Sequence, residues 1–296
     1  MSNSISFSIV IPTHNSSKYI HKTLDNIFAE IRESDYRYEI IIVDDLSEDI
    51  DALIEIIHDY KNVILINKEY KSNAADSRNI GFKKSKADIV FFLDSDDFFL
   101  QGYITRRINL HHEHKAGVIF GRFYSNNTIT VMNDYDYGDF RKYLFGGNGD
   151  IRSSTISICK TYHKKTLFDK NQNKHQDWGF GIRCYDNKEV FYYDSIEGVN
   201  IDTNLNEFRM SNKNNLTASD YFIEEFKLTS EMKYFFVKMH LINTIFNKDK
   251  SAIQFYRKII SGSYSKTNVA LKVKLFALFL LSYIPKPLVK VIKFVL

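Results

Sequence analysis

Hydrophobic and polar positions follow two different periods along the first hundred residues. Short apolar runs rich in β-branched residues predict buried strands at 7–11, 39–43, 63–66 and 89–93. Between these runs, apolar residues recur at helical spacing and predict helices around 20–31, 50–57 and 74–84. Strands that alternate with helix-length segments pair in parallel through right-handed crossovers. The pattern therefore predicts an α/β fold with a mostly parallel central sheet flanked by helices.

Polar residues stand at the carboxyl ends of three of these predicted strands. They are Pro12-Thr13-His14-Asn15, Asp44-Asp45 and Asp94-Ser95-Asp96-Asp97. Ligands of parallel sheets bind beyond the carboxyl ends of the strands, so we expect the three groups to share one crevice. Crowded carboxylates repel one another unless a cation compensates, which makes the third group a candidate metal site. Helix capping or solvent exposure is the alternative for such acids, and for Asp97 capping is the prediction.

Two common phosphate-binding patterns are absent from the sequence. No Gly-x-Gly-x-x-Gly follows the first strand, and no Gly-x4-Gly-Lys-Ser/Thr occurs. These absences argue against a dinucleotide-binding fold and a P-loop NTPase. A cation on the clustered carboxylates would hold a diphosphate instead.

The pattern is less regular beyond residue 100. It predicts a helix at 104–114, strands at 118–124, 129–132, 154–160 and 191–193, and loops at 134–139 and 145–150. His111, His112 and His114 point in different directions on a helix, so we interpret them as a solvated face rather than a metal site.

Two further groups carry candidate chemistry, each with an open alternative. Gln176-Asp177-Trp178 suits a sugar site, because indole packs on a sugar ring and a carboxylate accepts a hydroxyl proton. Equally, Asp177 would be a helix-capping acid and Trp178 a core residue. Arg209, in a polar stretch at 204–217, would clamp a phosphate or be solvated.

Composition bounds the class of protein. The 296 residues are 44% hydrophobic with a net charge of +4, which supports a substantial core and gives no basis for nucleic acid as a partner. The two cysteines lack metal-ligand spacing, and the first residues do not read as a signal peptide, so we expect a cytoplasmic protein. Residues 266–296 combine lysines with apolar runs and contain no acid. They predict amphipathic helices on an anionic membrane surface, with a hairpin packed on the domain as the alternative.

The motif series resembles that of family 2 glycosyltransferases, which have the GT-A fold. The resemblance covers roughly residues 5 to 215, and its motifs occur in the family's order: Ser8–Asn15, Val43–Ser47, Ser77–Gly81, Leu93–Asp97 and Gln176–Trp178. It implies a GT-A domain at 1–215, with a nucleotide-binding half at 1–100 and an acceptor half at 101–215. A helical region at 216–296 would follow.

The resemblance also implies roles for individual residues. The nucleotide would contact Pro12, Thr13, His14, Asn15, Asp45, Arg78, Asp94, Ser95 and Arg209. Within this set Asp45 would accept a hydrogen bond from the base. Asp96 would bind Mg²⁺ or Mn²⁺, with Asp94 as a secondary ligand. Asp177 would be the catalytic base, and Gln176 and Trp178 would contact the acceptor or sugar.

The implied function is metal-dependent, inverting transfer of a sugar from a nucleotide sugar, most simply a UDP-sugar, to a glycan or lipid-linked oligosaccharide. The family's common role in bacterial capsule or lipopolysaccharide synthesis would place the protein on the cytoplasmic face of the inner membrane. A nucleotidyltransferase and a non-catalytic binding scaffold are the alternatives. Leu46 stands where the family usually has glycine, and Gln176 where it has glutamate. The second change removes a like charge beside Asp177 and should ease its ionisation.

Overall fold

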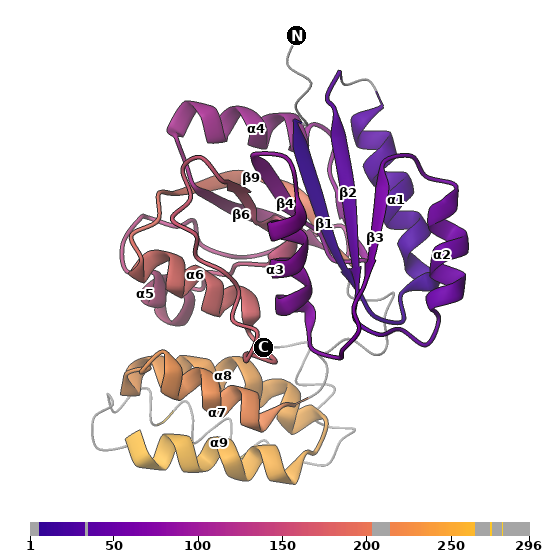
Figure 1. The fold of residues 1–296 in the computed structure, drawn as a ribbon. Coiled ribbons are helices and arrows are strands. Elements are labelled where there is room, and N and C mark those ends of the chain that lie inside the picture. Colours follow the sequence, from indigo (N-terminus) through magenta and orange to yellow (C-terminus); the bar gives the residue numbers. More distant parts are fainter. Residues whose placement is uncertain (1–5, 33–34, 203–213, 264–272, 274–279, 281–296) are drawn as a thin grey trace.

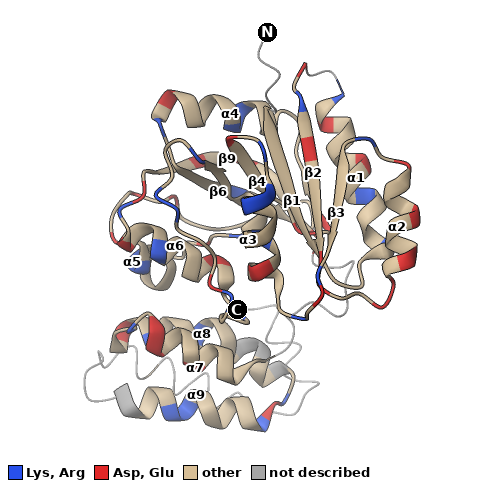
Figure 2. Cartoon of the chain, viewed as in Figure 1, with Lys and Arg blue, Asp and Glu red and all other residues tan. Residues whose placement is uncertain are grey.

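The apolar runs of the first hundred residues form the parallel half of a central sheet. The computed structural model describes residues 6–32, 35–202 and 214–263, together with positions 273 and 280. All four strands predicted in this half are confirmed, and their neighbour order is β3-β2-β1-β4. Strand β1 carries no charged residue, as expected for a strand covered on both faces (Figure 2). The four strands are β1 (Phe7–Thr13), β2 (Tyr38–Asp44), β3 (Val63–Asn67) and β4 (Ile89–Phe92).

The second half of the sheet is mixed. Within the described residues the strands form one nine-stranded sheet that continues from β4 in the order β8-β6-β9-β5, with β7 pairing β6. Strand β8 is antiparallel to β4 and β6, whereas β9 is parallel to β6 and antiparallel to β5. The strands are β5 (Asp97–Phe99), β6 (Val118–Ser125), β7 (Thr128–Ile129), β8 (Ser157–Cys159) and β9 (Phe191–Ile201).

Helices pack on both sides of the sheet (Figure 1). They are α1 (Ser17–Ile31), α2 (Ile50–His58), α3 (Ala74–Lys84), α4 (Tyr103–His114), α5 (Phe140–Gly146) and α6 (Gln176–Asp186), with a 3-10 turn η1 (Ser153–Thr155). Helix α3 approaches β1 so closely that a Cβ at Gly81 would collide with the side chain of Val10. The glycine therefore permits the contact that places the N-terminal end of α3 beside the strand ends.

Four predictions in this region need correction. Of the predicted strand 129–132 only position 129 lies in a strand, because β7 ends at Ile129. The predicted strand 154–160 is shorter, because η1 occupies Ser153–Thr155 and β8 spans only Ser157–Cys159. The segment 145–150 does not belong wholly to a loop, because α5 extends to Gly146. The histidines of α4 do not share one solvated face. His112 and His114 are exposed, but His111 is buried, with its ring nitrogens 2.7 Å from the Ala116 carbonyl oxygen and 2.9 Å from Ser157 Oγ.

Within the described residues, three helices follow the α/β domain and form a layer beneath α5 and α6 (Figure 1). Among the helices of the described ranges, none has both the length and the apolar character needed to cross a bilayer. Apart from positions 273 and 280, the predicted membrane-binding segment 266–296 lies outside the described residues. The three helices are α7 (Leu216–Glu225), α8 (Ser230–Phe246) and α9 (Lys250–Ser263).

Candidate active site

The three polar strand ends lie at one edge of the sheet. Strands β2, β1 and β4 are adjacent and parallel, and Thr13 is in register with Asp44. The chain reverses sharply beyond β1, where Asn15 has a φ of 53° and its side chain accepts a hydrogen bond from the Glu48 N–H at 2.8 Å. Pro12 and Thr13 are buried at the end of β1, whereas His14 and Asn15 are exposed. The two exposed residues are therefore the ones that can meet a ligand directly.

The side chain of Asp44 bonds to neighbouring residues at this edge of the sheet. Its carboxylate accepts hydrogen bonds from Thr13 Oγ1 at 3.0 Å and from the backbone N–H of Ser47 at 2.8 Å. Leu46, which lies between Asp44 and Ser47 in the sequence, has a left-handed φ of 54°. The loop thus retains the backbone turn that a glycine would adopt, at the cost of the strain that a side chain adds there, about 1 kcal/mol.

Asp45 is buried and lies beside two lysines that the sequence pattern did not predict, of which Lys68 is buried and Lys71 is half-exposed. Lys68 Nζ lies 2.6 Å from its Oδ1, Lys71 Nζ lies 3.2 Å from its Oδ2, and the Ser72 N–H donates to Oδ1 at 2.8 Å. Burial alone would raise the pKa of Asp45, but the hydrogen bonds from Lys68, Ser72 and Lys71 outweigh it and lower the pKa. Asp45 therefore remains an anionic acceptor, as recognition of a base N–H requires.

Arg78 connects the strand-end acids with helix α6. Its Nη2 lies 2.5 Å from Asp94 Oδ1, and its Nη1 donates to Gln176 Oε1 at 3.0 Å. The guanidinium is buried and stacks near the Phe168 ring, 5.4 Å from the ring centroid. Gln176 completes its own bonding by donating to the Gln172 carbonyl at 2.8 Å. Its side chain thus fixes Arg78, a role different from the predicted contact with acceptor or sugar.

The acids after β4 have separate environments. Asp94 is 39% exposed at its side chain, and Asp96 is buried. Ser95 donates from its hydroxyl to Ser16 Oγ at 3.0 Å, which fixes the loop against the start of α1. Asp97 opens strand β5, and its carboxylate accepts from Ser154 Oγ at 2.6 Å. The prediction that Asp97 caps a helix is therefore wrong, because the chain continues into a strand and its side chain bonds to a distant loop.

The donor atoms after β4 fit a divalent cation that arrives with a nucleotide. No group of three or more potential metal-binding side chains occurs in the part of the chain that the structure describes. Asp94 and Asp96 offer hard carboxylate oxygens at the end of one strand. Mg²⁺ is commonly held by one or two carboxylates together with substrate phosphates, rather than by a complete protein cage. The residues present match that arrangement.

Asp177 lies in the first turn of α6, which begins after His175 in a left-handed conformation (φ 61°). Burial raises the pKa of Asp177 from its ordinary 3.8 to about 6. The positive charges of Arg152 and Arg78 lower this pKa, and so does the hydrogen bond that the backbone N–H of Trp178 donates to Asp177 Oδ1 at 3.0 Å. The negative charge of Asp150 adds to the rise. Although Gln176 brings no like charge, the net effect is upward because burial dominates. A base that titrates near neutrality suits proton abstraction.

Trp178 is a core residue, which is the second of the two alternatives given for it above. It is only 7% exposed, and rings of His175, Phe145 and Phe222 surround it, with centroids 5.0, 5.7 and 6.2 Å from its own. Its indole N–H donates to Asp150 Oδ1 at 2.9 Å. The ring face predicted to stack on a sugar is therefore covered. Arg209, the remaining predicted residue, lies outside the described residues.

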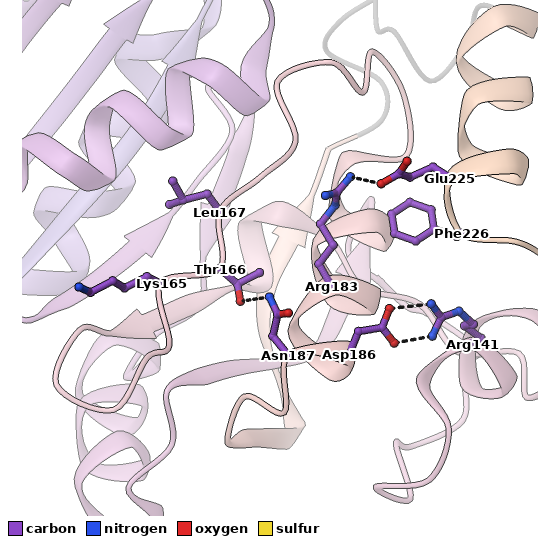
Figure 3. A pocket seen from close by; sticks show the side chains of 9 residues that line it. All are labelled: Arg141, Lys165, Thr166, Leu167, Arg183, Asp186, Asn187, Glu225 and Phe226. Atoms are coloured by element: carbon purple, nitrogen blue, oxygen red, sulfur yellow. Dashed lines mark hydrogen bonds and ion pairs between the residues drawn. The ribbon is translucent and has the colours of Figure 1, made fainter.

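A separate cavity of about 400 Å³ lies near the opposite end of α6 (Figure 3). Four of its charged residues form two pairs: Arg141 forms two 2.7 Å bonds with Asp186, and Arg183 lies 3.1 Å from Glu225. Its lining residues are Arg141, Lys165, Thr166, Leu167, Arg183, Asp186, Asn187, Glu225 and Phe226. None of the predicted site residues belongs to it.

Comparison with known proteins identifies the family. A family model described as glycosyl transferase family 2 matches residues 8–185, a range that includes every described site residue above. The chain belongs to glycosyl transferase family 2.

Two curated glycosyltransferases resemble the chain over part of their length. The amylovoran biosynthesis glycosyltransferase AmsB of Erwinia amylovora is 31% identical over 197 residues, 61% of this chain and 64% of AmsB. The poly(ribitol-phosphate) beta-N-acetylglucosaminyltransferase TarP of Staphylococcus aureus is 30% identical over 175 residues, 56% of this chain and 51% of TarP. The match thus spans between half and two thirds of these relatives.

A solved structure confirms the family 2 fold. The crystal structure of S. aureus TarS 1–349 in complex with UDP-GlcNAc aligns with a TM-score of 0.57 at 18% identity, covering 89% of this chain and 74% of that chain. At this level of identity the similarity concerns the fold, and it confirms the GT-A architecture predicted from the motif series, including a helical C-terminal region.

Proposed function

We propose that this protein is a metal-dependent, inverting glycosyltransferase that moves a sugar from a nucleotide sugar to a hydroxyl group of a glycan or lipid-linked glycan. The observation that carries the proposal is the bridge made by Arg78. One buried guanidinium bonds both Asp94, on the nucleotide side, and Gln176, which precedes Asp177. The family's donor-binding and base motifs therefore border the same space.

The donor side favours a uridine nucleotide. Asp45 is anionic and rigidly held, so its carboxylate can accept a hydrogen bond from the imide N–H of uracil. His14 is exposed beside it at the end of β1 and provides a flat ring for stacking on the base. The TarS structure was solved with UDP-GlcNAc, and TarP is named as an N-acetylglucosaminyltransferase, which supports a UDP-sugar donor.

Asp96 and Asp94 would hold Mg²⁺ or Mn²⁺ in the donor complex. The bound cation would neutralise the negative charge that develops on the leaving diphosphate. Arg78 keeps the carboxylate of Asp94 in place with a 2.5 Å bond. It also brings a fixed positive charge to the same region, where negative charge accumulates during transfer.

Asp177 is the proposed catalytic base. Its carboxylate removes the proton of the acceptor hydroxyl, and the oxygen then attacks the anomeric carbon from the face opposite the leaving diphosphate. A single displacement of this kind inverts the anomeric configuration. The raised pKa of about 6 leaves Asp177 ionised at neutral pH yet basic enough to accept a proton.

The relatives also inform the proposed biological setting. AmsB is named for amylovoran biosynthesis and TarP for poly(ribitol-phosphate) modification, so we propose a role in bacterial surface polysaccharide synthesis. The acceptor would be a glycan or a lipid-linked oligosaccharide. Such an acceptor suits a protein at the cytoplasmic membrane face, and the basic, acid-free segment 266–296 would contact the anionic lipids.

A donor screen tests the proposal. The full-length protein is incubated with Mn²⁺ and a panel of nucleotide sugars, and both thermal stabilisation and release of nucleoside diphosphate are recorded. We expect UDP-sugars to stabilise the protein and to be hydrolysed slowly, with the loss of both effects in excess chelator. Stabilisation by no nucleotide in the panel would contradict a transferase function. Equal hydrolysis with and without chelator would contradict the metal requirement.

A further inference from the structure

Asp150 and Arg152, in the loop between α5 and η1, form an ion pair that borders the site described above. Arg152 donates from Nε to Asp150 Oδ2 at 2.8 Å, and its Nη2 lies 2.7 Å from the same oxygen. The other oxygen of Asp150 accepts from the Trp178 indole at 2.9 Å and from the Ile151 N–H at 2.9 Å. Both oxygens of Asp150 thus have directed donors, and the pair is anchored to α6.

The anchor itself is rigid because the C-terminal helices enclose it. Phe222 from α7 and Phe236 from α8 lie with ring centroids 6.2 and 6.4 Å from Trp178. His175 stacks on the indole at 5.0 Å, with the planes only 14° apart. A buried aromatic ring held on several sides has one orientation, so the direction of its N–H is fixed by packing. The position of Asp150 therefore depends on α7 and α8.

Arg152 is linked to the proposed base through Asp150 and Trp178, because Trp178 bonds Asp150 with its indole N–H at 2.9 Å and Asp177 with its backbone N–H at 3.0 Å. Its side chain is 42% exposed and lies over the Phe123 ring at 5.7 Å. The charge of Asp177 acts on it, together with those of Asp150 and Asp97. Arg78 from α3, whose own charge is shared with Asp94, also acts on Asp177. The charged groups that act on Asp177 are thus Arg152, Asp150 and Arg78.

We propose that Arg152 is a positioning residue that keeps the carboxylate of Asp177 ionised, and that Asp150 and the Trp178 indole hold Arg152 in place for this role. The importance of this role for transfer rests on the proposed function of Asp177 as base. Asp150 carries the same charge as Asp177 and by itself disfavours ionisation. Pairing with Arg152 converts Asp150 into an anchor for a compensating charge.

Titration of Asp177 in the absence of substrate tests the proposal directly. The full-length protein is labelled with ¹³C at the aspartate carboxyl groups, and the signal of Asp177 is assigned by its loss in Asp177→Asn. We expect a midpoint near 6 for the unaltered chain. Arg152→Gln should raise the midpoint by about 1 unit, as expected when a nearby opposite charge is removed. Arg152→Lys should restore most of the difference.

Trp178→Phe provides a second test, because it keeps a six-membered aromatic ring in the cluster while it removes the five-membered ring whose N–H holds Asp150. We expect a rise of the Asp177 midpoint in the same direction as in Arg152→Gln, and no additional rise when the two changes are combined. Arg141→Gln is the matched control. It removes an equivalent ion-paired arginine, bonded to Asp186 at the far end of α6, and should leave the midpoint unchanged.

An Asp177 midpoint that stays within 0.2 unit in Arg152→Gln, a cut-off of about 0.3 kcal/mol, overturns the proposal. Equal shifts in Arg152→Gln and Arg141→Gln do so as well, because they would reflect net charge alone. This result is distinguishable from failure of the proposed function. Absence of transfer from every nucleotide sugar would leave the titration unchanged, whereas an unmoved midpoint would leave any measured transfer intact.

Discussion

Replacing the proposed base should make the protein more stable, in a manner that depends on pH. Burial raises the pKa of Asp177 from its ordinary 3.8 to about 6 in the folded chain. A rise of about 2 units corresponds to about 3 kcal/mol, at about 1.4 kcal/mol per unit. Above pH 6, the folded state therefore carries a carboxylate that its surroundings disfavour, and Asp177→Asn removes that cost.

The pH dependence follows from proton binding. Between pH 4 and 6 the folded state holds a proton on Asp177 that the unfolded state has released, so this group's contribution to stability falls as pH rises through that range. Relative to the unaltered protein, the asparagine variant should be about equally stable at pH 4. Its advantage should grow up to pH 6 and remain near 2 to 3 kcal/mol at pH 7 and 8, by the same linkage.

Urea unfolding at pH 4.5, 5.5, 6.5 and 7.5 measures this difference. Asp186→Asn is the matched control, since it alters an exposed aspartate of the same helix that pairs with Arg141. That change should lower the free energy of unfolding by less than about 1 kcal/mol at pH 6.5 and 7.5. A destabilised Asp177→Asn protein at pH 7.5, or a gain that is the same at all four pH values, would refute the reasoning.

Three further predictions concern the donor side. Asp96→Asn should abolish metal-dependent release of nucleoside diphosphate, and activity that still responds to Mn²⁺ would count against Asp96 as the principal ligand. Lys68→Met should lower the free energy of unfolding by about 3 kcal/mol, measured in urea, because it leaves Asp45 buried without its 2.6 Å partner; a loss below 1 kcal/mol would show that Lys71 suffices. Arg78→Lys should weaken UDP binding in calorimetry by at least about tenfold, since lysine cannot bond Asp94 and Gln176 together; unchanged affinity would contradict the bridge.

The first half of the fold follows from local sequence. The β-branched runs and helical periods place β1 to β4, and helix α3 spans the predicted 74–84. The strand ends then share an edge as a consequence of parallel pairing, which requires no knowledge of distant contacts. The motif series adds the family and, as a proposal, the base, because its members occur in the family's order along the chain.

The remaining features depend on residues far apart in the chain. Asp97 starts a three-residue strand whose partner in β9 is Ile201, so the local run of acids gave no sign of it. Trp178 belongs to the core because Phe222 and Phe236, more than forty residues later, cover it. Lys68 and Asp150 gain their roles from contacts with residues distant in the sequence, among them Asp45 and Trp178, and a sequence pattern does not record such contacts.

Whether Asp177 is the base is decided by measuring donor binding and transfer separately in Asp177→Asn. UDP binding in the presence of Mn²⁺ is measured by calorimetry, and sugar transfer or donor hydrolysis is measured on the same preparations. The account predicts UDP affinity within about twofold of the unaltered protein, a difference of about 0.4 kcal/mol, together with complete loss of transfer. Loss of UDP binding along with transfer would assign Asp177 to donor binding or structure, and retained transfer would show that another group is the base.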